Sequence, residues 1–191
     1  MSRKPSRRNV QRAFVELLAA LGATPYGALR GSPQRAAALW SEHLLSGERE
    51  DVSRIIGAGI RNKRHTPVAV THIGMHLVCP HHLTVAFGEA HVAYAPEGKL
   101  VGFGTLTRLV RACTSRFVLQ EEAGQLVADA LATHLGARAA AVLLVATHPC
   151  HNVTMPRAHK ARAATWAVAG RSRDARDLKT LILSTLNEKD A

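Results

Sequence analysis

Two short clusters of cysteine and histidine, far apart along the chain, most constrain how this sequence can fold. Cys79 and His82 lie in the segment Cys-Pro-His-His-Leu, and Cys150 lies in a later His-Pro-Cys-His segment. The first spacing lets a thiolate and an imidazole bind one ion from a single turn, and Cys150 can add a second thiolate from a distant strand. Two sulfurs and one nitrogen are typical of a catalytic Zn²⁺, which keeps its fourth position for water. The sequence therefore predicts a fold that brings Cys79, His82 and Cys150 together.

The competing interpretation is a pair of unrelated cysteines among surface histidines. A lone Cys-x-x-His would favour it, but here a second Cys/His pair follows an apolar strand, and this favours a metal site. The third cysteine, Cys113, shares an apolar helical stripe with Leu109 and Val110, so we expect it in the core. Three cysteines are too few, and odd in number, for a disulfide framework. This count predicts a reducing compartment, and so a cytoplasmic protein.

The composition is that of a globular protein with an anionic partner. Hydrophobic residues make up 47% and charged residues 20% of the 191 positions. We find neither the roughly 20-residue apolar run of a membrane span nor the apolar region of a signal peptide, so no membrane association is expected. The net charge of +11 suggests nucleic acid or a phosphorylated small molecule. Because aromatic residues are only 4% and no docking motif is present, the small molecule is favoured over nucleic acid.

The hydrophobic periods predict an α+β fold. Apolar residues at helical spacing predict helices over residues 10–21, 33–44, 106–117 and 126–135 and from 174 onward. Alternation with a period of two predicts strands over residues 67–79 and 83–95, and a continuous apolar run predicts a strand over 139–146. Shorter strands are expected over residues 100–103 and 161–168. Gly88 is expected to form a bulge in the second strand. The polar segment 48–66 is ambiguous between a short helix and a loop.

These elements divide the chain into three predicted parts. Residues 1–66 form a basic arm and a helical extension, residues 67–170 form the catalytic domain, and residues 171–191 form a C-terminal helix. The predicted metal ligands Cys79 and His82 then lie on the tight connection between two adjacent strands. Such a connection is a rigid place from which to present ligands.

Several motifs, in the right order, resemble the GTP cyclohydrolase I family. The resemblance covers residues from about 10 to about 170. The family's Cys-Glu-His-His-Leu, Gly-x-Ala-x-Val-Ala-Tyr-x-Pro, Val-Gln-Glu and His-x-Cys are similar to residues 79–83, 88–96, 119–121 and 148–150. The family's Pro-x-Arg helix is similar to residues 33–35. The resemblance implies the tunnelling fold, a four-stranded antiparallel sheet backed by two helices, with an N-terminal helical extension. It also implies a homodecamer of two stacked pentameric rings, with active sites at the subunit interfaces.

The resemblance further implies a zinc-dependent reaction on a guanine nucleotide. Cys79, His82 and Cys150 correspond to the family's zinc ligands, and His81 and His148 correspond to two histidines that move protons. Zinc-bound water would attack C8 of the imidazole ring, the opened ring would lose formate, and GTP would become 7,8-dihydroneopterin triphosphate. Imidazole suits the proton transfers because it both donates and accepts near neutral pH.

The resemblance also implies a set of substrate-binding residues. Glu121 matches the carboxylate that binds the guanine edge, and Gln120 would lie beside it. Arg108 and Arg157 remain at basic positions that match the family.

Four positions depart from the family pattern. Pro80 stands in place of a glutamate, Gly104 in place of a serine, Thr105 in place of a lysine and Thr154 in place of an arginine. The lysine and the arginine bind the triphosphate in the family, and charge-assisted contacts of this kind are worth roughly 1.5–3 kcal/mol each. Nearby basic residues that can substitute are Arg162, Lys160 and His159. The alternative is therefore a homologous zinc hydrolase that acts on a less phosphorylated or different purine-like heterocycle.

Overall fold

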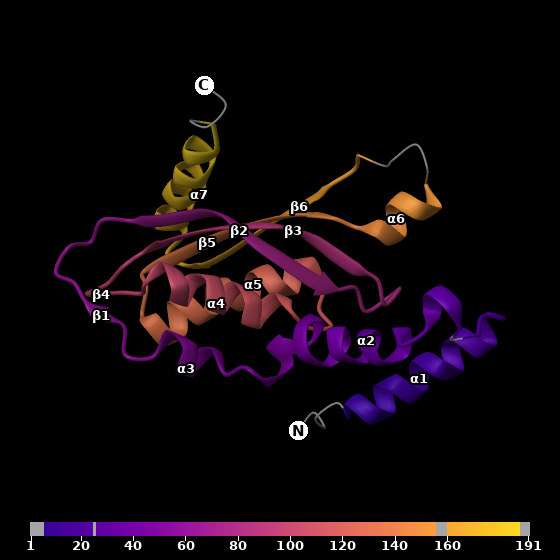
Figure 1. The fold of residues 1–191 in the computed structure, drawn as a ribbon. Coiled ribbons are helices and arrows are strands. Elements are labelled where there is room, and N and C mark those ends of the chain that lie inside the picture. The colour runs from indigo at the N-terminus through magenta and orange to yellow at the C-terminus, as the bar shows by residue number, and fades with distance from the viewer. Residues whose placement is uncertain (1–5, 25, 156–159, 188–191) are drawn as a thin grey trace.

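A four-stranded antiparallel sheet forms the centre of the computed structural model, which describes residues 6–24, 26–155 and 160–187 (Figure 1). The strand order is β2-β3-β5-β6, and each strand runs antiparallel to its neighbours. The strands are β2 (Val68–Val78), β3 (Val85–Ala95), β5 (Ala139–Thr147) and β6 (Ala163–Gly170). This arrangement confirms the predicted α+β class.

Helices cover both faces of the sheet. The helices α4 and α5 lie on one face and α7 lies on the other (Figure 1). Their bounds are α4 (Phe103–Thr114), α5 (Gln120–Ala130) with its continuation η4 (Leu131–Leu135), and α7 (Ser172–Asn187). β5 is apolar along most of its length because both of its faces are buried. Val142 and Leu144 belong to the core on the α4 and α5 side, and Ala141 and Leu143 to the core beneath α7. The two helices behind a four-stranded sheet, expected of the tunnelling fold, are confirmed.

The N-terminal extension is helical, as predicted. It consists of α1 (Arg7–Ala20), η1 (Gly27–Leu29), α2 (Ser32–Ala38), η2 (Leu39–Leu44), η3 (Ser46–Arg49) and α3 (Val52–Ile56). α1 has no buried residue and rests on the next helices through Phe14, whose ring centroid lies 6.1 Å from that of Trp40. A salt bridge of 2.9 Å between Arg7 and Glu42 joins the same elements. The division into three parts at residues 66 and 170 stays a prediction.

The extent predicted for the short third strand, residues 100–103, is wrong. β4 (Lys99–Leu100) is only two residues long, and it pairs with β1 (Ile60–Arg61) in a separate two-stranded sheet. Phe103 already begins α4. Tyr94 fixes this junction, because its buried hydroxyl accepts a hydrogen bond of 3.1 Å from the backbone N–H of Val101.

The bulge expected at Gly88 is also wrong. Gly88 pairs in regular register with Met75 on one side and Ala146 on the other. Glycine is needed here because β3 and β5 approach each other closely. A Cβ atom at position 88 would collide with the carbonyl oxygen of Val145. The register shift lies in β2, where His72 adopts a positive φ of 59°.

Cys113 is a core residue, as predicted. Its side chain is 1% exposed and belongs to the cluster beneath α4 and α5. Burial raises the pKa of the Cys113 thiol to about 11, so this thiol stays protonated near neutral pH. Among the residues that the structure describes, no helix combines the length and the apolar character needed to cross a membrane.

Candidate active site

The strand order brings the two cysteine and histidine segments together at one end of the sheet. The turn after β2 carries Cys79 and His82, and it leads directly into β3. The turn is closed by hydrogen bonds of 2.9 Å from the N–H of Cys79 to the carbonyl of Thr84 and from the N–H of Leu83 to the carbonyl of Cys79. β5 runs antiparallel to β3, so its last residues lie beside the start of β3. Cys150 follows on the short helix α6 (Pro149–Thr154) and thereby reaches the turn.

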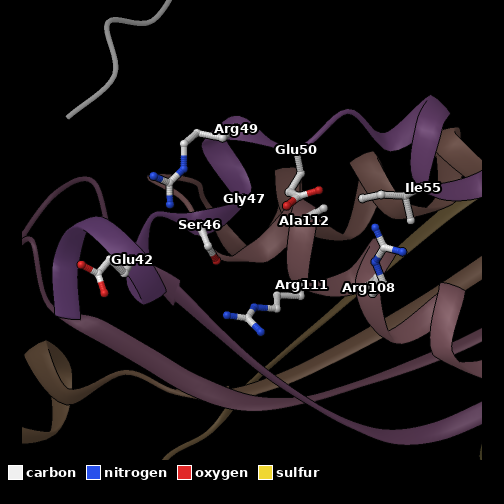
Figure 2. Close-up of a pocket in the computed structure, with 9 residues that line it drawn as sticks. All are labelled: Glu42, Ser46, Gly47, Arg49, Glu50, Ile55, Arg108, Arg111 and Ala112. Atoms are coloured by element: carbon white, nitrogen blue, oxygen red, sulfur yellow. The ribbon is translucent and has the colours of Figure 1, made fainter. Parts of the chain in front are cut away.

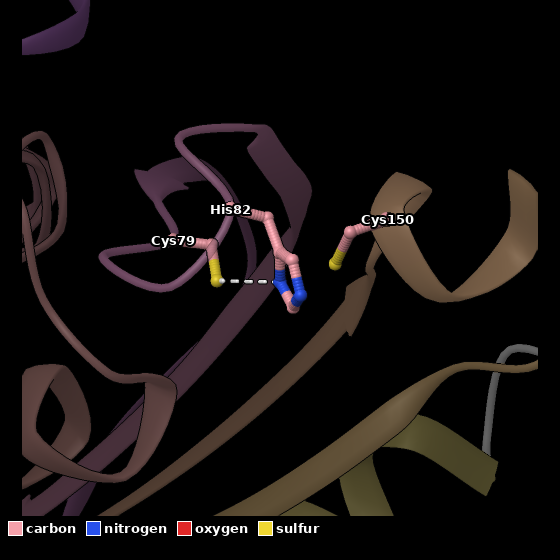
Figure 3. A group of neighbouring side chains, drawn as sticks. All are labelled: Cys79, His82 and Cys150. Carbon is pink, nitrogen blue, oxygen red and sulfur yellow. Dashed lines mark hydrogen bonds between the residues drawn. The ribbon is translucent and has the colours of Figure 1, made fainter. Parts of the chain in front are cut away.

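The three predicted metal ligands form one compact group (Figure 3). The Sγ of Cys79 lies 3.9 Å from Nδ1 of His82, and one ligand atom from each of Cys79, His82 and Cys150 lies within 4.8 Å of the others. Ligand atoms bound to one tetrahedral zinc, at about 2.0–2.3 Å from the ion, are roughly 3.4–3.8 Å apart. A small inward movement of these side chains would therefore complete a site for zinc. Within the described chain this is the one group of three such side chains.

A cavity of about 230 Å³ adjoins the three candidate ligands and gathers most of the other predicted site residues. His81, His148, Gln120 and Glu121 all line it. His81 lies within the turn, and its ring centroid lies 6.3 Å from that of His82. His148 lies between the end of β5 and α6, so a single short segment carries both this histidine and Cys150.

Gln120 is the first residue of α5 and is 4% exposed. Its side-chain nitrogen donates to the carbonyl oxygens of Leu144 at 3.0 Å and Ala163 at 3.1 Å, and to the hydroxyl of Thr165 at 3.1 Å. Its side-chain oxygen lies 2.8 Å from Nε2 of His148. Glu121, the next residue, has an exposed side chain at the same cavity.

Arg108, one of the two predicted phosphate-binding residues, does not line this cavity. Arg108 lies on α4 and lines a different cavity of about 340 Å³, together with Arg49 and Arg111 (Figure 2). Arg157 lies outside the described residues, as does His159. Of the suggested substitutes, Arg162 lines a cavity of about 300 Å³ that it shares with His148.

The hydroxyl of Thr154 has its hydrogen-bond partners in its own helix. The hydroxyl donates within its own helix, to the carbonyl oxygens of Cys150 at 2.9 Å and His151 at 3.2 Å. His151 lines both the cavity beside the candidate metal ligands and the neighbouring cavity that Arg162 lines. Sequence reasoning did not assign His151 a role, although its place directly after Cys150 was a usable signal.

Comparison with known proteins agrees with this geometry. The profile of a family described as GTP cyclohydrolase I matches residues 10–187. The chain belongs to the GTP cyclohydrolase I family. This confirms the family resemblance that the motifs at residues 79–83 and 148–150 indicated, and with it the prediction that the chain is an enzyme of this hydrolase type.

Individual relatives carry the same name. The chain is 35% identical over 161 residues to "GTP cyclohydrolase 1" of Chromobacterium violaceum, covering 84% of this chain and 78% of that protein. It is 29% identical over 187 residues to the Bacillus subtilis protein of that name, covering 97% and 98% of the two chains. A third match, of 42% over 117 residues to the Ralstonia nicotianae protein, covers 61% of this chain and 56% of that one. Among solved structures, the apo archaeosine synthase QueF-Like aligns with a TM-score of 0.47 at 18% identity, covering 57% of this chain and 98% of that chain.

Proposed function

We propose that this protein is a zinc-dependent cyclohydrolase that opens the imidazole ring of a guanine nucleotide, converting GTP and water into formate and 7,8-dihydroneopterin triphosphate. One observation carries the proposal. Donor atoms of Cys79, His82 and Cys150 lie within 4.8 Å of one another, and the same cavity holds His148 and Glu121. A metal-binding group, a histidine and a carboxylate at one cavity suit hydrolysis of a purine ring, and the chain belongs to the family.

Cys79, His82 and Cys150 would hold the zinc. A set of two thiolates and one imidazole suits Zn²⁺ and leaves a position open, as catalytic zinc sites do. Zinc in such a site acts as a Lewis acid and lowers the pKa of water enough to supply a nucleophile near pH 7. All three side chains line the cavity, so a substrate in this cavity would lie next to the metal that they would hold.

His81 and His148 carry protons in this proposal. Addition of water at C8 and rupture of the ring's C–N bonds require a proton to leave the attacking water and protons to reach the ring nitrogens. Two imidazoles at one cavity can take and give these protons near neutral pH. Neither histidine is needed as a metal ligand, because the three-donor cluster is formed without them.

Glu121 would orient the base. A carboxylate accepts two hydrogen bonds side by side, and the guanine edge presents two adjacent N–H donors. Glu121 lines the cavity from the first turn of α5, and its exposed carboxylate would be accessible to a base in the cavity.

The proposed assembly is a cytoplasmic homodecamer. β2 and β6 are the edges of an open sheet and therefore have unpaired backbone groups for neighbouring copies. Arg108 lies in another cavity of its own chain, so in this proposal it serves the active site of an adjacent subunit. Arg157 is assigned to the phosphates only by its matching position. The three free cysteines suit a reducing compartment.

A second candidate function is hydrolysis of a less phosphorylated purine-like substrate. The observation that favours it is the loss of cations at positions 105 and 154, together with the hydroxyl of Thr154 being satisfied within α6. Neutral hydroxyls can bind a sugar but cannot offset the charge of a triphosphate.

The test is formate release by zinc-loaded protein from GTP, GMP, guanosine and guanine, each at low and moderate salt. A strong preference for GTP that weakens with salt would support the GTP reaction and dismiss the second candidate. Equal or better use of guanosine would reverse that conclusion, and the double variant Thr105→Lys, Thr154→Arg should then gain activity on GTP. If formate appears from none of the four, the proposed reaction is refuted.

A further inference from the structure

The side chain of Gln120 is held in one orientation by the protein. Its nitrogen lies within 3.0–3.1 Å of three oxygens, and two of these, of Leu144 and Ala163, are carbonyl oxygens that can only accept. If the amide were turned over, its own oxygen would face both carbonyls without a hydrogen between them. Gln120 is 4% exposed, so water cannot replace these partners. Hydrogen bonding therefore decides which atom of the amide is nitrogen and which is oxygen.

This orientation determines where the proton of His148 lies. The Gln120 oxygen is 2.8 Å from Nε2 of His148, and an amide oxygen only accepts, so Nε2 must carry a hydrogen. A neutral imidazole has one N–H, which leaves the lone pair on Nδ1. Within the described chain Nδ1 has no hydrogen-bond partner. It is the nitrogen that remains available to a substrate or a water molecule.

We infer that Gln120 is a positioning residue that fixes His148 in the tautomer with hydrogen on Nε2 and the basic lone pair on Nδ1. The meaning of this tautomer for catalysis rests on the proposed function, but the tautomer itself does not. Gln120 joins three elements, since it starts α5 and bonds to Leu144 of β5 and to Ala163 and Thr165 of β6. His148 follows the end of β5, so the amide fixes the ring relative to the sheet that also carries the metal ligands.

This role differs from the one that the family resemblance implied for Gln120. Both ends of its amide bond to groups of the protein, so a side-chain bond to a substrate would have to replace one of these contacts. Glu121 beside it keeps an exposed carboxylate for that purpose.

The test compares Gln120→Met with a matched control. Methionine keeps the length of the side chain but lacks the amide oxygen that accepts the hydrogen bond from Nε2 of His148. Gln125→Met is the control, because Gln125 lies on the same helix and its amide bonds to Asp129 and to the carbonyl of Val168, away from the site. Zinc-loaded proteins labelled with [¹⁵N]histidine are examined by NMR, and the His148 signals are assigned by their loss in His148→Ala.

The wild type and the control should show His148 with a protonated Nε2 and an unprotonated Nδ1, whereas Gln120→Met should show a mixture of tautomers. For GTP, Gln120→Met should lower kcat by roughly tenfold to a hundredfold, the effect of removing a residue that orients a catalytic imidazole, while KM stays within about twofold and zinc content is unchanged. The control should match the wild type in both respects.

A hydrogen on Nδ1 of His148 in the wild type would overturn the inference, whether or not the protein is active on GTP. A kcat for Gln120→Met within twofold of the wild type would overturn the positioning role. If the wild type releases no formate from any substrate, the proposed function fails and the wild-type spectrum alone decides the tautomer. The same spectrum decides it if Gln120→Met does not fold.

Discussion

Replacing Cys150 by serine should remove the metal while leaving the fold in place. The structure holds three donors within 4.8 Å, and two of them, Cys79 and His82, come from one turn. Cys150 is the donor that closes the site from the other side, on the first turn of α6. Serine keeps the shape of the side chain, but its hydroxyl is a poor zinc ligand beside a thiolate.

The magnitude follows from the number of ligands. Structural zinc sites with four protein ligands bind with roughly 10–16 kcal/mol near pH 7, which is about 2.5–4 kcal/mol for each ligand. At about 1.4 kcal/mol for each factor of ten, the loss of Cys150 should raise the Kd for zinc by roughly two to three powers of ten. Cys79 and His82, 3.9 Å apart, would remain as a weak two-donor site.

The assay is a competition titration with a chromophoric chelator, together with the zinc content after dialysis. Wild type should retain about one zinc per chain, and Cys150→Ser should retain almost none. Cys113→Ala is the matched control, since it removes the buried third cysteine and should leave zinc affinity unchanged. An affinity for Cys150→Ser within about threefold of the wild type would refute the assignment of Cys150 as a ligand.

Three further predictions test the proton carriers, the core and the assembly. His81→Ala and His148→Ala should each keep their zinc and lower turnover by at least about a hundredfold, measured as formate release; zinc loss from His81→Ala would show that His81 is itself a ligand. Tyr94→Phe should lower the free energy of unfolding by about 1–3 kcal/mol in urea denaturation, because the N–H of Val101 loses its buried acceptor, and an unchanged midpoint relative to the exposed control Tyr26→Phe would contradict this. Light scattering should find roughly ten chains in each particle, since the sheet has two open edges, and a stable monomer would argue against the ring assembly.

The sequence predicted those parts of the fold that follow from local patterns. Alternation with a period of two located β2 and β3 to within a few residues, and the continuous apolar run at residues 139–146 located β5, because these strands pack against the core. The same reasoning failed at Gly88, where glycine accommodates the backbone of a neighbouring strand rather than a bulge. It also missed α6 and the pairing of β1 with β4, which are too short to show a period.

The candidate site, too, was predictable from the sequence only in part. The motif spacing was sufficient to select Cys79, His82 and Cys150, which the structure then brings together. The environment of Gln120 could not be predicted, because it depends on carbonyl groups of Leu144 and Ala163 that approach only when β5 pairs with β6. Backbone acceptors leave no trace in a sequence, so long-range hydrogen bonds to them are visible only in the folded chain.

The charges around the cavity beside the candidate metal ligands bear on both the substrate and the assembly. Among the described residues that line this cavity there is no lysine or arginine, while Glu121 adds a negative charge to it. Zinc would be balanced by its two thiolates, so a triphosphate with about four negative charges would find no net positive charge in this cavity. The cations that could offset it lie elsewhere, with Arg162 in the adjoining cavity and Arg108 and Arg111 in a separate one. If Arg108 serves a neighbouring subunit, GTP turnover should depend on assembly, whereas ring opening of an uncharged nucleoside should depend on it far less. Measuring both substrates as the oligomer is diluted or dissociated would therefore separate a triphosphate site shared between subunits from a cavity suited to an uncharged purine.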